Sequence, residues 1–362
     1  MKCIVPKNSD VLFLVKRWDH HTPSGGYNLL AQSMGGTVVN RANNEGFSNR
    51  AARFFRRRFM PPTNLLVDYN ERDWFAELNV LVKANINRSS MVHVLYGDEQ
   101  LDTLLRWRRL LPCPLVATFH LPTDRDYVKA RFEGPQKNLL RRIDAAIVVS
   151  KSQLPDFRRW LGPDRVVYIP HGIDTQLFSP QSQKLNDGVI RLVSVGEHMR
   201  DFEALHCIMD ECRILKLNVV FDVVVPRSIH AYFFGCTNVR LHAEITEKQL
   251  IDLYHKADAL LLPVTDATAN NAVLESMACG TPIISTAIGG IPDYVDETAG
   301  WLFPKGDVKN IVELIIAGSA DPSIFHSKRV GTRIKSLEFD WQQIVSKLRS
   351  VYMSIRNNTP FD

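Results

Sequence analysis

The stretch LLLPVTDATANNAVLESMACGTPIISTAIGGIPDYVDETAGWLFPKGD, residues 260–307, decides the fold and indicates a ligand site. Its first apolar run, up to Pro263, predicts a buried strand, and a helix then starts for which Asn270 or Asn271 is a natural N-cap. The helix carries Glu275 and stops at CGTP, after which a second strand runs to a pair of glycines. A helix N-terminus favours a bound diphosphate, and adjacent glycines let backbone amides approach a ligand.

Short apolar runs alternate with longer amphipathic stretches along the rest of the chain as well. They predict the buried strands of two parallel sheets that are covered on both faces. The predicted strands are residues 10–15, 92–96, 115–119, 145–149 and 166–169 in a first unit, and 191–195, 219–225, 259–262 and 282–285 in a second. The polar, proline- and glycine-punctuated stretch 179–188 separates the two groups, and we place the domain boundary there.

Length and composition agree with this two-domain α/β plan. A chain of 362 residues is too long for one ordinary core, and 45% hydrophobic with 23% charged residues is typical of a globular protein. Six cysteines without CxxC spacing indicate neither a zinc site nor a disulfide framework and fit a reducing cytoplasm. The apolar run Val11 to Val15 is too short for a signal peptide or a spanning helix. We therefore expect a cytoplasmic protein.

Residues 258–307 resemble the donor site of the retaining glycosyltransferase family 4. Glu275 matches the family glutamate that binds the ribose hydroxyls of the nucleotide, whereas the glutamate that usually holds the donor sugar falls at Ala267. Asp266, Asn270 and Asn271 stand beside that position, and we predict that they contact the donor. The resemblance implies a GT-B fold, in which two Rossmann-like domains have parallel sheets facing a central cleft.

The resemblance extends to other segments of the second domain. In SVGEHMRDFEAL, Gly196 is kept and Arg200 stands near the lysine that grips the diphosphate, with His198 beside it. The alternative is a surface arginine paired with a neighbouring carboxylate. Ile245 lies where the family chain runs beside the nucleotide base, and the amides around Gly289 and Gly290 match the family's glycine loop.

In the first domain, WDHHTPSGGYNLL follows the first strand and VATFHLPTD carries His120 at a strand end. Gly25 and Gly26 match the family's glycine-rich loop, and His120 matches a histidine that contacts the donor sugar near its reacting centre. His20 and His21 fall in the acceptor half. Adjacent histidines in an extended loop point apart, so we expect no metal site, as the family implies.

A basic aromatic stretch, SNRAARFFRRRFMPP (48–62), is the other notable feature. As a helix it gives an amphipathic element with a basic face that includes Arg53, Arg56 and Arg57, which suits an anionic membrane surface. A solvated helix beside the acceptor site, or one that binds an acidic acceptor, is the alternative. No nucleic-acid-binding motif accompanies the stretch, so nucleic acid is not an expected partner.

Taken together, the resemblance implies transfer of a sugar from a nucleoside-diphosphate sugar, UDP-sugar favoured over GDP-sugar, with retention of configuration. The acceptor would be a glycan or a lipid, and the enzyme would be cytoplasmic or peripheral on the inner face of the cell membrane. We assign His120, Arg200 and Glu275 as the central residues, and the chain to domains 1–180, with the C-terminal helix 339–362 crossing back to it, and 181–338. Two alternatives stay open: a sugar-nucleotide epimerase, and a nucleotide-sugar-binding partner subunit without transfer activity.

Overall fold

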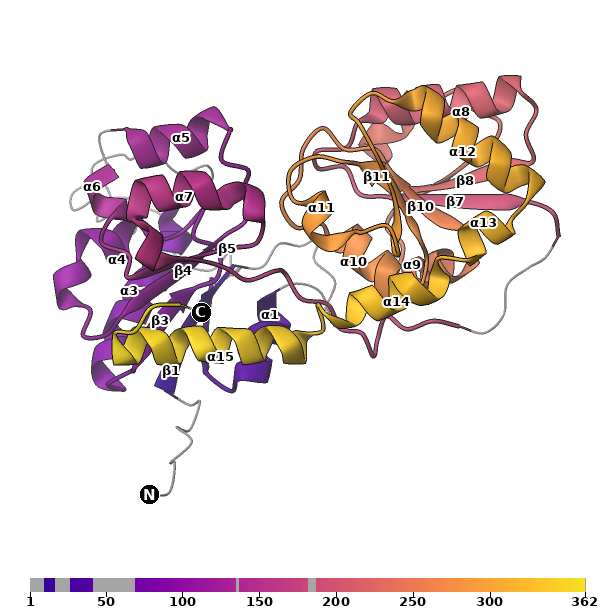
Figure 1. Ribbon diagram of the computed structural model, residues 1–362. Helices are drawn as coiled ribbons and strands as arrows, with labels where there is room; N and C mark the ends of the chain where they lie inside the picture. The colour runs from indigo at the N-terminus through magenta and orange to yellow at the C-terminus, as the bar shows by residue number, and fades with distance from the viewer. Residues whose placement is uncertain (1–9, 17–26, 42–68, 135–136, 182–186, 362) are drawn as a thin grey trace. The chain divides into compact units, whose positions relative to one another are not determined.

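The computed structural model describes residues 10–16, 27–41, 69–134, 137–181 and 187–361. The chain divides into two compact units: Met1–Pro170 with Gln342–Asp362 form the first, and His171–Trp341 form the second. Each unit contains a six-stranded parallel sheet with helices on its faces (Figure 1).

The sheet of the first unit has the strand order β2-β1-β3-β4-β5-β6, so the direction of strand addition reverses between β1 and β3. Its strands are β1 (Val11–Val15), β2 (Thr37–Asn40), β3 (Met91–Val94), β4 (Leu115–Phe119), β5 (Ala145–Val148) and β6 (Val166–Tyr168). Its helices are α1 (Tyr27–Met34), α3 (Glu71–Ile86), α4 (Asp102–Arg106), α5 (Asp126–Glu133), α6 (Lys137–Leu140), α7 (Leu154–Leu161) and most of α15 (Trp341–Asn357).

The two faces of this sheet are covered by different parts of the chain. Alternate residues of the strands pack on α3, α4, α5 and α7 in one apolar core. On the other face His93 of β3 bonds through Nδ1 to the Tyr352 hydroxyl of α15, 2.5 Å away, and through Nε2 to the Thr118 hydroxyl at 2.8 Å. Burial lowers the pKa of His93 to about 3, so the imidazole is neutral. The C-terminal helix thus completes the core of the first unit.

The second sheet has the order β12-β11-β10-β7-β8-β9, in which the direction of strand addition reverses between β7 and β10. Its strands are β7 (Ile190–Val195), β8 (Val219–Val224), β9 (Val239–His242), β10 (Ala259–Leu262), β11 (Ile283–Thr286) and β12 (Gly300–Phe303). Its helices are α8 (Phe202–Ile214), α9 (Glu247–Lys256), α10 (Asn271–Ala278), α11 (Ile291–Tyr294), α12 (Val308–Ala320), α13 (Ser323–His326) and α14 (Arg329–Leu337). One apolar core packs α8 and α12 on the sheet, and another packs α9, α10 and α11 on its opposite face (Figure 1).

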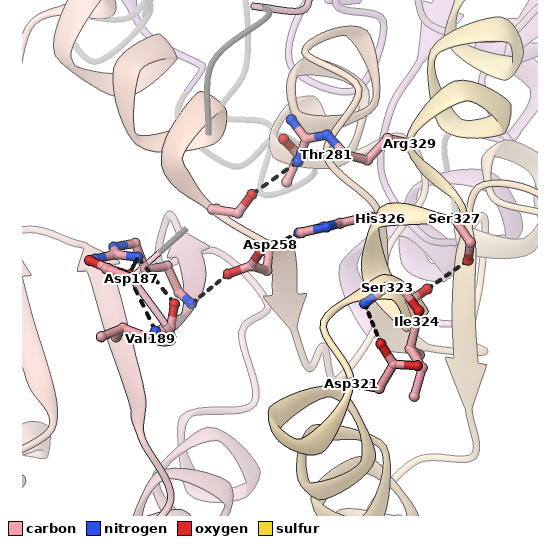
Figure 2. Close-up of polar contacts among 12 residues, drawn as sticks. Asp187, Val189, Asp258, Thr281, Asp321, Ser323, Ile324, His326, Ser327 and Arg329 are labelled. Atoms are coloured by element: carbon pink, nitrogen blue, oxygen red, sulfur yellow. Dashed lines mark hydrogen bonds and ion pairs between the residues drawn. The ribbon is translucent and has the colours of Figure 1, made fainter. Parts of the chain in front are cut away.

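Asp258 fastens the amino ends of β7 and β10 to α13. Its Oδ2 accepts the backbone N–H of Arg191 at 2.8 Å, and its Oδ1 lies 3.0 Å from Nε2 of His326 (Figure 2). The side chain is nearly buried, so these bonds replace the water it loses. This end of the sheet is therefore closed by structural contacts, and a ligand site has to be sought at the carboxyl ends of the strands.

The structure confirms the predicted α/β class and all nine predicted strands, most within one or two residues of their ends. It adds β2, β9 and β12, each an edge strand of four residues whose side chains are only partly buried. These strands contain at most three consecutive apolar residues, which is too short a run to identify a strand from the sequence. Residues 171–180, which the sequence grouped with the first domain, belong to the second unit because Phe178 is buried in its core and the Ile173 N–H bonds to the Phe339 carbonyl at 2.9 Å.

Candidate functional site

The loops that follow β7 and β10 are joined to each other at the point where the strand order reverses. The Asp201 N–H donates to the Pro263 carbonyl at 3.0 Å, and the Thr265 N–H donates to the Met199 carbonyl at 2.9 Å. Between these bonds Arg200 and Val264 pair as an isolated antiparallel bridge. In open parallel sheets ligands bind outside the strand carboxyl ends at this point. The second unit therefore presents a braced two-loop platform there.

Arg200 lies on this platform with its guanidinium folded back over the end of β7. Its Nε donates to the Val195 carbonyl at 2.9 Å and its Nη1 to the His198 carbonyl at 2.8 Å. A Cβ on Gly196 would lie only 2.9 Å from Nη2, so glycine leaves room for the guanidinium. Burial lowers the pKa of Arg200 to about 10, which keeps it cationic at neutral pH. Nη2 bonds to no described residue, so this nitrogen can donate to an anion.

The alternative of a surface arginine paired with a neighbour does not describe Arg200. The carboxylate of Asp201 is used as the N-cap of α8, where it accepts the Ala204 N–H at 3.0 Å. His198 contributes its backbone carbonyl to Arg200, and its side chain is exposed. The sequence analysis predicted that His198 contacts the diphosphate. In the structure the main-chain carbonyl of His198 orients Arg200.

Glu275 is buried on α10, where Tyr254 of α9 holds it. The Tyr254 hydroxyl donates to Oε2 at 2.9 Å, whereas Oε1 accepts no hydrogen bond from a described residue. Burial raises the pKa of Glu275 to about 7, while the Tyr254 hydrogen bond and the nearby charge of Arg200 oppose that shift. One carboxylate oxygen is thus fixed by the protein and the other can accept hydrogen bonds from hydroxyl groups. Tyr254 escaped the sequence reading, although a buried tyrosine on a helix demands a partner for its hydroxyl.

The start of α10 supplies a second feature of the site. The side chain of Asn270 caps the helix by accepting the Val273 N–H at 3.4 Å, so its carbonyl oxygen serves the fold. The N–H groups of Asn271 and Ala272 have no intrahelical partner, and the Asn271 side chain is exposed. Of the two asparagines predicted to bind the donor, Asn270 shapes the helix end and Asn271 presents groups to solvent.

The glycine pair after β11 closes against the loop after β10. Gly289 has φ +56°, and a Cβ there would lie 2.0 Å from the Ala267 carbonyl oxygen. Gly290 donates its N–H to the same carbonyl at 2.8 Å. The sequence assigned both amides to the ligand, but the Gly290 amide holds the loop, and only the Gly289 amide lacks a partner among the described residues. Asp266 accepts the Ala267 N–H at 2.7 Å and is half-buried in this turn.

Lys305 is a cation that the sequence reading did not single out. It lies in the loop after β12, and its Nζ reaches the Thr265 carbonyl at 3.4 Å on the two-loop platform. It is exposed and forms no ion pair with a described carboxylate, whereas Lys309 in the same region lies 3.8 Å from Glu313. The signal in the sequence is a charged residue two positions after a strand, but that strand, β12, is a short edge strand that the sequence did not predict.

In the first unit His120 follows β4 and stands between two tyrosine rings. Its Nε2 lies 2.7 Å from the Leu95 carbonyl, which fixes the proton on that nitrogen in the neutral ring. The ring centroids of Tyr27 and Tyr96 lie 4.8 and 5.0 Å away. Lys16, directly after β1, is buried and paired with Glu99, which follows β3. Polar groups thus gather at the carboxyl ends of β1, β3 and β4.

Several predicted residues lie outside the described part of the chain: Gly25, Gly26, His20, His21, Arg53, Arg56 and Arg57. Ile245 is described and half-buried, in the turn between β9 and α9 that leads to Tyr254. Among the described residues no three His, Cys, Asp or Glu side chains are grouped to hold a metal. Nor does any described helix combine the length and apolarity that crossing a bilayer requires.

Comparison with known proteins identifies the family of the chain. A family model described as "Glycosyltransferase Family 4" matches residues 37–177, and one described as "Glycosyl transferases group 1" matches residues 189–321. The chain belongs to glycosyltransferase family 4. The enzyme is 24% identical over 290 residues to the MMP alpha-(1->4)-mannosyltransferase of Mycolicibacterium hassiacum, which covers 72% of this chain and 70% of that protein.

Solved structures confirm the GT-B fold of this glycosyltransferase. Sucrose-phosphate synthase from Thermosynechococcus elongatus superposes with a TM-score of 0.70 at 18% identity, covering 96% of this chain and 99% of that one. Anabaena HepE in complex with UDP-glucose gives a TM-score of 0.67 at 16% identity, over 95% and 99% of the two chains. Retention of configuration is consistent with membership of the family.

Proposed function

We propose that this glycosyltransferase transfers a sugar from a nucleoside-diphosphate sugar, and that its second unit binds the donor around Glu275 and Arg200. The proposal rests on two side chains that the protein orients while leaving one atom of each available. Tyr254 holds Oε2 of Glu275, and two backbone carbonyls hold Nε and Nη1 of Arg200, so Oε1 and Nη2 can contact a ligand. A carboxylate that accepts hydrogen bonds suits a pair of ribose hydroxyls, and a guanidinium suits a phosphate oxygen.

The leaving diphosphate sets the energetic demand of the reaction. As the bond between the anomeric carbon and the phosphate oxygen breaks, negative charge grows on the diphosphate, and fixed donors aimed at that charge stabilise it. Arg200, the first N–H groups of α10 and the Gly289 amide are the donors that we assign to it. Lys305 adds an exposed positive charge at the same platform.

We propose that the acceptor proton passes to the leaving phosphate oxygen on the face that the diphosphate leaves, which gives retention. The acceptor oxygen bonds to the anomeric carbon, the carbon–phosphate-oxygen bond breaks, and the products are a glycoside and a nucleoside diphosphate. His120 is the residue of the first unit that we assign to the reacting sugar, because it stands at a strand carboxyl end with a fixed tautomer. The Gly25–Gly26 loop is assigned to the same side on sequence alone.

UDP-sugars are the donors we expect first. HepE, which shares the fold, is described in complex with UDP-glucose. Binding of UDP-, GDP- and ADP-sugars, measured by calorimetry, tests the nucleotide, and product analysis with and without an acceptor pool separates transfer from epimerisation. Absence of binding for every nucleoside diphosphate sugar would remove the proposed function. Binding of a donor without its consumption under any acceptor would leave only a binding role.

We further propose a lipid or lipid-linked acceptor, which rests on the sequence of the basic aromatic stretch alone. Each Lys or Arg near an anionic surface contributes on the order of 1 kcal/mol, so replacing Arg53, Arg56 and Arg57 together is expected to release the protein from vesicles that contain phosphatidylserine. The test is co-sedimentation with anionic and neutral vesicles. Equal sedimentation of the triple variant and the parent would show that the stretch serves another purpose.

A further inference from the structure

A buried arginine holds the loop after β3, residues 95–101, by hydrogen bonds to its main-chain carbonyls. Arg131 of α5 is 6% exposed and donates from Nη1 to the carbonyls of Gly97 and Asp98, each at 2.6 Å, and from Nη2 to the carbonyl of Gln100 at 2.9 Å. A buried guanidinium loses its hydration, and its donors must be satisfied to offset that loss. Three backbone acceptors from four consecutive residues meet this demand only if the loop keeps one shape.

A buried carboxylate of α3 holds the far end of the same loop. Glu77 is fully buried and accepts the N–H groups of Leu101 and Leu104, each at 2.9 Å, at the start of α4. On the opposite side the Gly97 N–H donates to the Thr118 carbonyl at 2.7 Å, which ties the loop to β4. A Cβ on Gly97 would lie 3.0 Å from both the Phe119 ring and the Thr118 carbonyl oxygen, so glycine allows this close approach without displacing β4. The loop is thus fixed on three sides.

The side chain that this fixed loop presents to β4 is Asp98. Its Oδ2 accepts the backbone N–H of His120 at 2.5 Å, directly after the last residue of the strand. The His120 ring in turn donates to the carbonyl of Leu95, at the start of the same loop. The loop therefore contacts His120 twice, once at its main chain and once at its ring. Both contacts would shift together if the loop moved.

We propose that Asp98 is a positioning residue for His120, and that Arg131 holds Asp98 in place for that task. The proposal rests on the role assigned to His120 in the proposed function. In this arrangement Asp98 itself touches no substrate. It sets where the strand end turns and hence where the imidazole stands between Tyr27 and Tyr96.

Asp98 is also placed to respond to pH. Burial raises its pKa to about 7, against the His120 and Leu121 N–H groups and the charge of Arg131, which favour the ionised form, while Glu99 disfavours it. Among the described residues, Tyr127 of α5 is a further titratable group that interacts with it, and the charge of Asp98 contributes to the raised pKa of Tyr127. The ionised carboxylate is the stronger acceptor, so the bond to His120 weakens as the pH falls through about 7.

The sign of the stability effect is opposite to that of the positioning effect. Because the folded state holds the Asp98 proton more tightly than the unfolded chain, this group's contribution to stability is full below about pH 4 and is lost as the pH rises through about 7. The His120 contact strengthens over the same interval. A purely structural Asp98 would make turnover follow stability, whereas a positioning Asp98 makes turnover rise while its stability contribution falls.

The first test follows the geometry without using activity. In the full-length protein the His120 amide proton, observed by TROSY NMR, is expected to shift with a midpoint near pH 7. In Asp98→Asn, whose amide oxygen still accepts the hydrogen bond but does not titrate, the resonance is expected to stay constant. A His120 amide that does not titrate in the parent, or that titrates equally in Asp98→Asn, overturns the proposal.

The second test uses a matched control at the other end of the same strand. Asp144 accepts the Leu115 N–H at 2.7 Å, so Asp144→Ala removes a carboxylate–backbone bond at the amino end of β4 just as Asp98→Ala removes one at its carboxyl end. We expect Asp98→Ala to lower kcat about tenfold or more with donor KM nearly unchanged, and Asp144→Ala to lower the unfolding free energy without that loss. Asp98→Asn, whose neutral amide is a weaker acceptor than the carboxylate, should recover only part of kcat relative to Asp98→Ala and should flatten its fall between about pH 8 and about pH 6.

Equal losses of kcat in Asp98→Ala and Asp144→Ala, or no recovery in Asp98→Asn, would show that Asp98 only stabilises the fold. Calorimetric UDP-sugar binding is measured on every variant, so failure of the donor assignment appears separately, as loss of binding in the parent. His120→Ala completes the set. If it turns over at the parental rate, the role proposed for His120 is wrong and Asp98 has nothing to position.

Discussion

The carboxyl ends of the two sheets are fixed by different means. In the first unit buried ionisable side chains, Arg131 and Glu77, hold a loop by bonding to its main chain. In the second unit the main chain holds itself, through the bonds between the loops after β7 and β10 and between Gly290 and Ala267. The difference decides which charges remain for a ligand. The first unit uses buried ionisable side chains to fix the shape of a loop, whereas the second leaves polar atoms of Arg200, Glu275 and Lys305 available to a ligand.

The largest effect is expected from removing Arg200. Arg200→Ala is expected to lower kcat by about 10²–10³, the usual cost of losing one donor to a developing anion. The matched control is Arg191, which lies near the amino end of β7, the strand before Arg200, and is paired with Asp187. Arg191→Ala should leave kcat unchanged. Steady-state kinetics with a saturating donor measures both. Similar kinetics for the two variants would contradict the assignment of Arg200 to the diphosphate.

The second-largest effect is expected for Glu275, whose loss should weaken nucleotide binding rather than the stabilisation of the leaving diphosphate. Glu275→Ala is expected to weaken nucleotide binding by about a hundredfold, because hydrogen bonds to a charged group each contribute about 1.5–3 kcal/mol. Tyr254→Phe, which removes the hydroxyl that orients Oε2, should cost about tenfold. Calorimetric titration with the nucleoside diphosphate gives both values.

Asp258→Ala is the control for Glu275, since it removes a buried carboxylate at the opposite end of β10. It should lower the unfolding free energy by about 1–3 kcal/mol and leave nucleotide affinity intact. If Glu275→Ala binds nucleotide as the parent does, the ribose contact lies elsewhere.

The smallest effect is expected for Lys305. Because its side chain is exposed and its charge is screened, Lys305→Ala should weaken nucleoside-diphosphate binding only about three- to tenfold, and less as salt is raised. Lys309→Ala, on the neighbouring helix, is the control and should have no effect. Affinity measured at low and high ionic strength provides the test. A salt-independent loss, or an equal loss in both variants, would remove Lys305 from the site.

The sequence predicted the buried strands of both sheets better than the contacts of the loops at their carboxyl ends. Central strands such as Leu115–Phe119 and Ala259–Leu262 were predictable because burial on both faces demands a continuous apolar run. The place of Glu275 on a helix after such a strand was predictable, whereas its assignment to the ribose came from the family resemblance and stays a proposal. Its partner Tyr254 lies on another helix, and only the fold brings the two within 2.9 Å.

Loop roles were the hardest to predict from the sequence. Gly290 looks like a ligand-binding glycine, and its amide is used by Ala267 because the two loops meet in space. Asp98 carries no motif at all, and its contact with His120 depends on the register of β3 against β4. A pattern along the chain predicts which residues follow strands, whereas the partners across strands come from the topology.

The helix α15 has a consequence for how the molecule is made. The first unit is discontinuous in the chain: its sheet is encoded before residue 170, but Tyr352, which covers His93, comes after the whole second unit. During synthesis the second unit is therefore complete before the first can close its core. Until the last helix emerges, the β3 face that carries His93 stays exposed, which is the state in which chains of this size aggregate or recruit chaperones. The enzyme's N-terminal half is thus finished last.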